Sequence, residues 1–353
     1  MTSVRDITGR AAAPEFDSPR RRLQQSVGTM GPVFAFLLLF VFFSVLRSDV
    51  FLSQGNIMSI ANNQAVLGIA ACGLTVVLLA GEFDLSIGST MSLTGTLGAG
   101  LVANQHWSPV MAVLAALAIG LLIGIVNGVL VAFFGVQALI ATLAVSSLLD
   151  GVSLWYTGGR TIFSGISPHY VEISRWNIDG LQGPVFYLVV LGALLWLWLR
   201  HTQSGRYIHA IGGNRDASRM TGIRVNKYVV TAFAVSGACA AAAGVLQTAH
   251  DGAATPLFGA SFLLPAFAAA FLGSATLRRG EFHIPGTIFG VYLIAVGSTG
   301  FVLLGAPFYT QQLFSGAVLI LATAGTKVFS RVRHRRPQAG ADNVNASTRS
   351  QGM

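Results

Sequence analysis

Charged residues are scarce in this sequence, and lysine is almost missing. Asp, Glu, Lys and Arg make up 10% of the 353 residues, against about 25% in soluble domains. Lys227 and Lys327 are the two lysines among 22 basic residues, and 53% of the chain is hydrophobic. With a mean hydropathy of +0.65, this composition excludes an ordinary soluble domain and indicates an integral membrane protein.

Several kinds of chemical site are also missing from the sequence. Cys72 and Cys239 each lie inside an apolar run, which does not suit an exposed disulfide or a metal site. His106, His169 and His250 are isolated, without the spacing of metal ligands. The sequence has neither a Gly-x-x-x-x-Gly-Lys-Ser/Thr phosphate loop nor residues with catalytic spacing. We therefore expect this chain to be no enzyme and to hold no metal or cofactor of its own.

The apolar residues gather in segments long enough to cross a bilayer, which takes roughly 20 residues of helix. We predict an all-α integral membrane protein with about ten transmembrane helices. The segments lie near residues 30–46, 57–80, 85–104, 109–133, 137–156, 184–200, 227–250, 261–276, 283–304 and 308–329. The predicted domains are a disordered cytoplasmic tail over 1–29, a transmembrane domain over 30–329 and a basic cytoplasmic tail over 330–353. The long connection 157–183 predicts a short ordered element on the outer surface.

The basic residues are divided unevenly between the two sides of these segments. Nineteen of the 22 lie in residues 1–29, in 200–227, at 278–279 and from Lys327 onward, whereas Arg47, Arg160 and Arg175 fall on the other side. Because cytoplasmic loops carry the excess of Lys and Arg, both termini are predicted to be cytoplasmic. The formal net charge of +9 reflects this excess of Lys and Arg in the segments predicted to be cytoplasmic. Since no basic stripe with interleaved aromatic residues occurs, we expect no nucleic-acid partner.

The stretch from 200 to 227 is an arginine-rich island between two apolar segments. Asn214 can cap a short helix that Gly222 ends, with Asp216 in the favourable first turn. The predicted docking residues are Asn214, Arg215, Asp216, Ala217, Ser218, Arg219 and Gly222. A helix this short is marginal alone in water, so we interpret it as a cytoplasmic knob that docks into a separate motor protein. The alternative is a solvated loop whose arginines only fix the topology.

Small residues recur at every fourth position of the segment 109–133, at Ala112, Ala116, Gly120, Gly124 and Gly128. Lipid provides little hydrophobic drive between helices, and small residues let two helix backbones approach closely. We therefore predict that Gly120, Gly124 and Gly128 serve helix packing.

Polar side chains inside the apolar segments mark a candidate translocation path. Amides offer donors and acceptors without a fixed charge, which suits a polyhydroxylated solute. The path candidates are Asn62, Asn63, Gln64, Asn127, Asp150, Tyr309, Gln311 and Gln312. The alternative for each is a hydrogen bond that only holds helices together. Asp150 is expected to face the bundle interior, because an acid that faces lipid is costly.

Asp84 directly precedes the segment 85–104, within the stretch Gly81-Glu82-Phe83-Asp84-Leu85-Ser86. A carboxylate at the start of a helix accepts hydrogen bonds from free backbone N–H groups and meets the positive end of the helix dipole. We predict that Asp84 is a helix N-cap at the inner mouth; the alternative is direct contact with the solute.

Three stretches together resemble the permease subunits of ribose-type bacterial ABC sugar importers. NIMSIANNQAVLGIAACGLTVVLLAGEFDLSIGS (56–89) resembles the second span of that family and its Gly-Gly-x-Asp-Leu-Ser-Val-Gly-Ser signature. VNGVLVAFFGVQALIATLAVSSLLDGVSLWYTGGRTI (126–162) is similar to its Asn-Gly to Thr-Gly-Gly-Arg block. GRYIHAIGGNRDASRMTGI (205–223) resembles its coupling segment, with the spacing of the Glu-Ala-Ala-x-x-x-Gly motif. The resemblance covers roughly residues 51–329.

The resemblance implies a ten-helix permease bundle in the bacterial cytoplasmic (inner) membrane that imports a monosaccharide or related polyol. It implies a second permease chain, usually an identical one, and an extracytoplasmic binding protein that delivers the sugar. Cytoplasmic ABC ATPases, which carry the ATP and Mg, would grip the coupling helices. In such a system this chain itself carries no cofactor, and its other contacts are with membrane lipid.

The sequence departs from the family pattern at several positions. Glu82 stands where the family commonly has Gly, Ala138 replaces the usual Pro, and Asp150 falls where a basic residue is common. Arg278, Arg279 and Glu281 occupy a stretch that is usually rich in Gly and Ser. These departures leave the solute open. An ion-coupled secondary sugar carrier, with Asp150 and Glu82 as a proton relay, is the alternative function.

Overall fold

The structure is a computed structural model that describes residues 19–334 except 277–279 and 308, with side chains from residue 31 to 324. Nearly all of this part is helical. Its helices are α1 (Pro19–Leu46), α2 (Ser48–Phe51), α3 (Gln54–Leu79), α4 (Ile87–Ala103), α5 (Pro109–Ala132), α6 (Ala138–Thr157), α7 (Pro168–Arg175), α8 (Gly183–His201), α9 (Gln203–Gly213), α10 (Arg215–Met220), α11 (Val225–Asp251), α12 (Ala260–Ala275), α13 (Ile284–Leu303) and α14 (Thr310–His334). Strands β1 (Asn177–Ile178) and β2 (Leu181–Gln182) form an antiparallel hairpin.

A long helix lies at each of the ten apolar segments predicted from the sequence, which are α1, α3, α4, α5, α6, α8, α11, α12, α13 and α14. Six described helices are long and apolar enough to cross a membrane by themselves: α3, α5, α6, α8, α11 and α13. Shorter apolar helices occupy Gly31–Leu46, Ala260–Ala275 and Thr310–Ala324. The helical membrane architecture is thus confirmed, while the count of ten spans stays a prediction.

The predicted amino-terminal tail is partly wrong. Helix α1 begins at Pro19, so residues 19–29 are helical and not disordered, and residues 1–18 lie outside the described part. Proline suits the first turn of a helix because it lacks only an N–H that would be unpaired there, and the apolar segment that follows lets the helix continue. Helix α14 likewise continues to His334, beyond the predicted boundary at 329. The rest of the basic tail, 335–353, lies outside the described residues.

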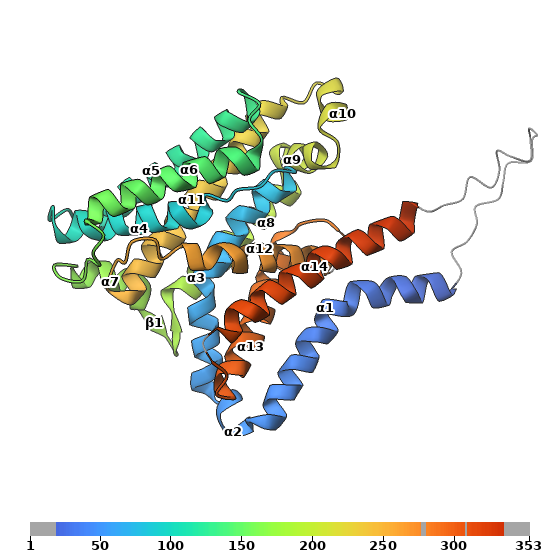
Figure 1. Cartoon of the computed structure of the whole chain (residues 1–353), viewed down its shortest axis with the longest axis horizontal. Coiled ribbons are helices and arrows are strands. Elements are labelled where there is room, and N and C mark those ends of the chain that lie inside the picture. The colour runs from blue at the N-terminus through green and yellow to red at the C-terminus, as the bar shows by residue number, and fades with distance from the viewer. Residues whose placement is uncertain (1–18, 277–279, 308, 335–353) are drawn as a thin grey trace, which may run out of the picture.

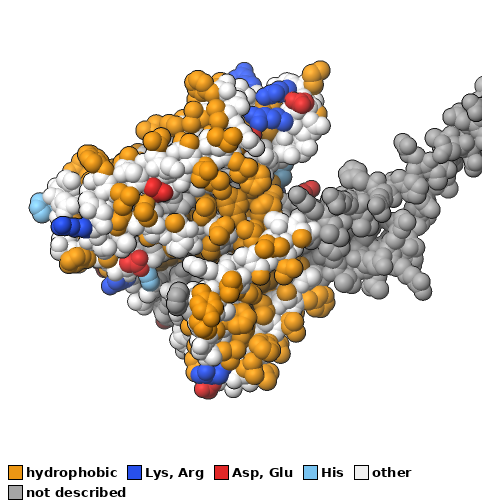
Figure 2. Space-filling model, viewed as in Figure 1, with side chains coloured by type: hydrophobic (Ala, Val, Ile, Leu, Met, Phe, Trp, Pro, Cys, Tyr) orange, Lys and Arg blue, Asp and Glu red, His pale blue; other side chains and the backbone are white. Residues whose placement is uncertain are grey.

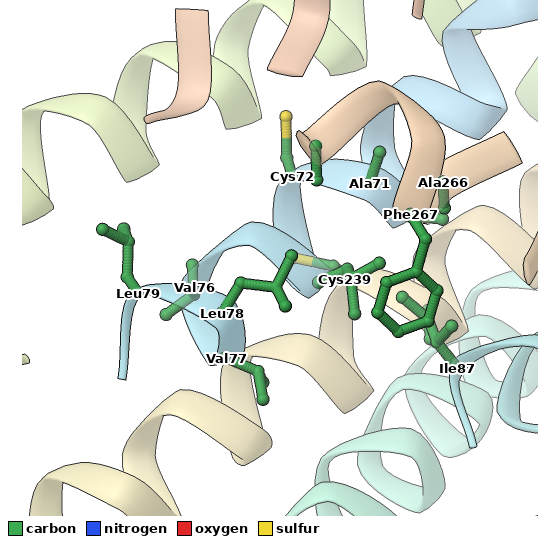
Figure 3. Packing of buried hydrophobic residues seen from close by; sticks show 14 of the residues in the cluster. Ala71, Cys72, Val76, Val77, Leu78, Leu79, Ile87, Cys239, Ala266 and Phe267 are labelled. Carbon is green, nitrogen blue, oxygen red and sulfur yellow. The ribbon is translucent and has the colours of Figure 1, made fainter. Parts of the chain in front are cut away.

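The core is built around α11, which packs against α3, α4 and α5 (Figure 1). Helix α3 is buried on all sides from Ala65 to Leu79, as expected for a helix that is hydrophobic all round. Figure 3 shows side chains of α3 such as Val76 and Leu78 in one buried cluster with Cys239 of α11 and Phe267 of α12. Helices α5, α6 and α8 are mostly exposed, since 28%, 22% and 33% of their apolar windows are buried. Exposed apolar surface of this kind suits contact with lipid.

Glycines bring α5 and α11 into direct backbone contact. A Cβ added at Gly124 would lie 2.2 Å from the Phe233 carbonyl oxygen, and one at Gly120 would lie 2.6 Å from that of Gly237. At Gly128 it would lie 2.6 Å from the Val230 Cα. The predicted stripe therefore does lie in a helix interface, where any larger side chain would separate the two backbones.

The connecting elements are sorted to opposite ends of the bundle (Figure 1). Helix α7, the β hairpin and α2 lie at one end, whereas α9 and α10 lie at the other. The beginning of α1 and the end of α14 also point toward the end that carries α9 and α10. The connection 157–183 thus contains the ordered element that the sequence predicts, namely α7 and the hairpin. From the arginine distribution, the end with α9 and α10 is predicted to be cytoplasmic.

Candidate functional site

Helix α10 is the predicted docking element, and its local structure agrees with the prediction. Asn214 is the N-cap, and its Oδ1 accepts a hydrogen bond from the Ala217 N–H at 3.0 Å. Asp216 lies in the first turn, where a negative charge is favourable. Gly222 follows the helix with a φ of +83°, a left-handed conformation that favours glycine.

The outer face of α10 is open to solvent and mixes charge with apolar surface. Met220 is 89% exposed, and the side chain of Asp216 is 91% exposed. Arg219 forms an ion pair with Asp216 at 3.6 Å, which at such exposure contributes little to stability. In Figure 2, Lys or Arg and acidic side chains gather over this part of the molecule, next to largely apolar helix faces. The face has the mixture of groups that a protein partner can bind.

The inner face of α10 is tied to the connection between α3 and α4. Arg215 donates a hydrogen bond from Nη1 to Oε1 of Glu82, and the two side chains form an ion pair. The Glu82 side chain is 13% exposed and that of Arg215 33%. Burial raises the pKa of Glu82, while the charge and hydrogen bond of Arg215 partly oppose this effect. A displacement of α10 would therefore act directly on the α3–α4 connection.

Helix α9 adds a second contact between α10 and the core. Its buried positions are Gly205, Ile208 and Ile211. Near its end, a Cβ added at Gly212 would lie 2.0 Å from the Leu79 carbonyl oxygen. The end of α9 therefore rests directly on the end of α3, and α10 follows it after a single residue.

The predicted N-cap role of Asp84 is wrong. Helix α4 begins at Ile87 after an N-cap at Ser86, and Asp84 lies two residues earlier, 2% exposed. Its Oδ1 accepts hydrogen bonds from the Ser86 N–H at 3.0 Å and the Ser86 hydroxyl at 2.6 Å. Its Oδ2 accepts one from the Ser236 hydroxyl of α11 at 2.8 Å. The carboxylate joins the turn before α4 to α11, and this turn delays the helix start.

Asn127 of α5 belongs to the same buried network. Its Nδ2 donates to the Ser86 hydroxyl at 2.7 Å, and Ser86 in turn donates to Asp84. Its Oδ1 is buried without a hydrogen-bond partner in the described part. Asp84 follows Glu82 by two residues in the α3–α4 connection. This connection therefore links α10 to α4, α5 and α11 through the network.

A ladder of hydroxyl groups between α4 and α6 was not predicted from the sequence. The Ser89 and Ser146 hydroxyls lie 2.6 Å apart, those of Thr96 and Ser153 3.4 Å apart, and Thr142 accepts from the Leu85 N–H at 3.0 Å. Each pair is separated by 57 residues. The two helices therefore run parallel in a fixed register, held by hydrogen bonds of the kind that join helices in lipid.

The structure does not bring the predicted path residues together. Asn62 is buried, and its amide donates to the Gly180 carbonyl at 2.9 Å and accepts from the Gln182 N–H at 2.8 Å. It therefore fastens the β hairpin to α3. Its neighbour Asn63 is exposed and donates to Ser59 of the same helix. Gln64 of the same helix is half-buried. Three other candidates, Tyr309, Gln311 and Gln312, are exposed at the start of α14. Asn127 is buried in α5.

Asp150 lies half-buried on α6. Among the described residues it has no hydrogen bond or ion pair. It is next to Gly151, which is exposed, on a helix whose faces are largely open. Asp150 lies one helical turn from Ser146 and Ser153, whose hydroxyls contact α4, and its predicted orientation toward the bundle interior stays a prediction.

Within the described part of the chain, no group of three or more His, Cys, Asp or Glu side chains could hold a metal ion. The main structural features of the site are the projecting helix α10, the Glu82–Arg215 ion pair and the buried network of Asp84.

Comparison with known proteins decides the family. A family model for the permease component of branched-chain amino acid transport systems matches residues 56–323, which is more than half of the chain. The ribose import permease protein RbsC of Escherichia coli K12 is 36% identical over 291 residues, covering 82% of this chain and 90% of the relative. This chain belongs to the family of ribose-type ABC importer permeases. It is a multi-pass protein of the bacterial inner membrane.

Other relatives of this permease agree with that assignment. RbsC of Bacillus subtilis is 33% identical over 295 residues, which cover 83% of this chain and 91% of the relative. The D-allose transport system permease protein AlsC of Escherichia coli is 28% identical over 301 residues, covering 85% and 92%. These relatives are transport subunits and not enzymes. No solved structure matches the chain.

Proposed function

We propose that this permease is the transmembrane subunit of an ATP-binding cassette importer for a monosaccharide or related polyol. The relatives named for ribose, D-allose and xylose support a small sugar as the transported solute. A separate ATPase, which holds the ATP and Mg, drives the transport, and an extracytoplasmic binding protein delivers the sugar. A second permease chain, an identical copy, completes the path.

The observation that carries this proposal is the construction of α10. A six-residue helix that is capped at Asn214 and ended at Gly222 has no stability of its own in water. It is nevertheless held rigidly to the core through Arg215 and projects an exposed face. Such a helix is suited to transmit a displacement from a bound partner to the membrane helices, because the Arg215–Glu82 ion pair joins it to the α3–α4 connection.

The mechanism follows from this linkage. Closure of the ATPase pair displaces α10, and the Glu82–Arg215 pair passes the displacement to the turn that holds Asp84. The network of Asp84 joins that turn to α11, and so the central helices shift with it. A partner shifts such an equilibrium only through contacts that differ between outward-open and inward-open states. The sugar path lies between the two permease chains, where the exposed Gln312 and the half-buried Asp150 of one chain face the other.

The test uses purified permease reconstituted in vesicles with and without its ATPase and binding protein. We expect sugar uptake only with all three and with ATP inside the compartment that holds α10. Gly222→Val forces a left-handed conformation on a β-branched residue, and Asp216→Lys reverses an exposed charge. Both variants should abolish uptake and weaken ATPase binding while the permease stays in the membrane.

The matched control is Gly55→Val, because Gly55 also has open space around its Cβ position but lies in α3 at the other end of the molecule. It should transport normally. Uptake that survives both α10 variants would contradict the docking role.

The alternative is an ion-coupled carrier that uses Asp150 and Glu82 as a proton relay. Leu85, three residues after Glu82, donates to Thr142 of α6, which is eight residues before Asp150. At a helical rise of 1.5 Å these eight residues span about 12 Å, and Glu82 is paired with Arg215. The alternative predicts uptake by this chain alone, lost when the proton gradient collapses and indifferent to ATP.

A further inference from the structure

A groove of about 560 Å³ lies at the end of the bundle that carries α9 and α10. It is bounded by the ends of α3 and α8, by α9 and by the start of α13. Neither the docking of α10 nor the Asp84 network uses it. Its volume is in the range of sites that bind small molecules.

Two arginines give the groove a positive charge. Arg200 and Arg206 line it, and no acidic residue does. In the described part of the chain, neither guanidinium has a hydrogen bond or a carboxylate partner; Arg200 lies 5.4 Å above the ring of Trp196. His209 also lines the groove, with Nδ1 bonded to the Gly205 carbonyl at 2.9 Å. Arginine forks match the geometry of phosphate oxygens.

Two other arginines at this end of the molecule are paired with carboxylates. Arg215 and Arg219 of α10, at the same end of the molecule, are paired with Glu82 and Asp216. Glu281, which precedes the start of α13, is exposed and does not line the groove. Two arginines that lack a partner in a concave site therefore leave a positive charge for an external anion.

The remaining walls are apolar and continue onto the lipid-facing surface. Leu79, Leu199 and Ile284 line the groove and are buried. Arg200 is one helical turn after Trp196 of α8, and α8 exposes an apolar face below them that contains Val189, Val190, Leu194 and Leu197. An anion bound at the arginines would thus have apolar surface leading from it into the bilayer.

We infer that this groove binds the headgroup of an anionic glycerophospholipid. The phosphate lies between Arg200 and Arg206, Trp196 packs at the headgroup level, and the acyl chains follow the exposed face of α8. Basic pockets at the ends of membrane helices bind anionic headgroups in this way, and Trp is typical of the membrane interface. Because apolar walls adjoin the charge, a lipid fits the groove better than a free phosphate ion.

The test is native mass spectrometry of the full chain in detergent, titrated with phosphatidylglycerol or phosphatidylcholine. We expect the wild type to retain phosphatidylglycerol preferentially. The variant Arg200→Gln with Arg206→Gln should bind it about tenfold more weakly. The matched control is Arg224→Gln, because Arg224 is exposed, unpaired in the described part and close to α10, but does not line the groove; it should bind as the wild type does.

Equal retention of the two lipids, or equal loss of binding in the control, would overturn the inference. Displacement of phosphatidylglycerol by millimolar inorganic phosphate would do so too, because the groove would then bind a free anion. A second measurement keeps both arginines, so its result does not depend on the folding of the double variant. Phosphatidylglycerol with brominated acyl chains should quench the tryptophan fluorescence of the wild type more than that of Trp196→Phe. Brominated phosphatidylcholine should quench the two proteins equally. An equal difference for both lipids counts against a headgroup site.

Discussion

Glu82 and Arg215 form an ion pair across 133 residues of sequence, between the α3–α4 connection and the first residue of α10. Glu82 occupies the second position of the stretch that resembles the Gly-Gly-x-Asp signature, so this permease has a charged link at that position. Because both side chains are at least half-buried, the pair is screened less by salt than a surface pair. The link makes specific predictions about coupling.

Removal of either charge should uncouple the ATPase from transport. Glu82→Gln or Arg215→Gln loses a charged hydrogen bond that contributes about 1.5–3 kcal/mol, so sugar uptake per ATP hydrolysed should fall roughly tenfold or more. The exchange Glu82→Arg with Arg215→Glu should restore much of the loss. Arg224→Gln is the control, since Arg224 is exposed, is not one of the predicted docking residues and has no ion pair among the described residues. A similar loss in Arg224→Gln would show that the effect is one of surface charge.

The coupling should also depend on pH. Because burial raises the pKa of Glu82, its carboxyl group takes up a proton at a higher pH than an exposed glutamate does, and the neutral acid cannot form the ion pair. The ratio of uptake to ATP hydrolysis should therefore be highest above this pKa and fall as the pH falls through it. Glu82→Gln lacks the titrating group, so the two proteins should converge at low pH. A constant difference across the range would contradict this account.

The contact between α5 and α11 predicts a selective effect of alanine at glycine positions. Gly124→Ala places a Cβ against the Phe233 carbonyl, and overpacking of this kind costs about 1–3 kcal/mol. The melting temperature of the purified permease should fall by several degrees. Gly151→Ala in α6 has open space and removes the helix penalty of glycine, so it should be neutral or stabilising. If Gly124→Ala and Gly151→Ala have the same melting temperature, the interface between α5 and α11 relaxes around the added Cβ.

The buried network predicts a ranking of variants at Asp84. Asp84→Ala leaves the donors of Ser86 and Ser236 without their acceptor, at about 1–3 kcal/mol for each unpaired group. Ser236→Ala removes a single donor and should cost less, because two hydrogen bonds to the carboxylate remain. Thermal unfolding in detergent measures both. If Ser236→Ala is as damaging as Asp84→Ala, the carboxylate does not organise the network.

The sequence was sufficient where the controlling interactions are local. The cap at Asn214 acts on Ala217, and the left-handed Gly222 ends the same short helix, so α10 could be predicted in detail. The repeat of Gly120, Gly124 and Gly128 likewise reveals a packing face from spacing alone, although it does not reveal that α11 is the partner.

The sequence was insufficient where distant segments compete for a side chain. Asp84 has the local features of an N-cap, but Ser236, 152 residues away, takes one of its oxygens. Asn62 has an amide suited to a solute, but the hairpin at Gly180 and Gln182 binds it. The register of α4 and α6 depends on hydroxyl groups 57 residues apart, a separation with no local signal. Tertiary contacts decided each of these roles.

Both native cysteines are inaccessible, with Cys72 0% and Cys239 3% exposed. A maleimide added to intact membranes would therefore modify only a thiol introduced at the surface, and the natural sequence can serve directly as the unreactive background. Met220→Cys would report which compartment faces the tip of α10, without any prior removal of native thiols that pack against the central helices.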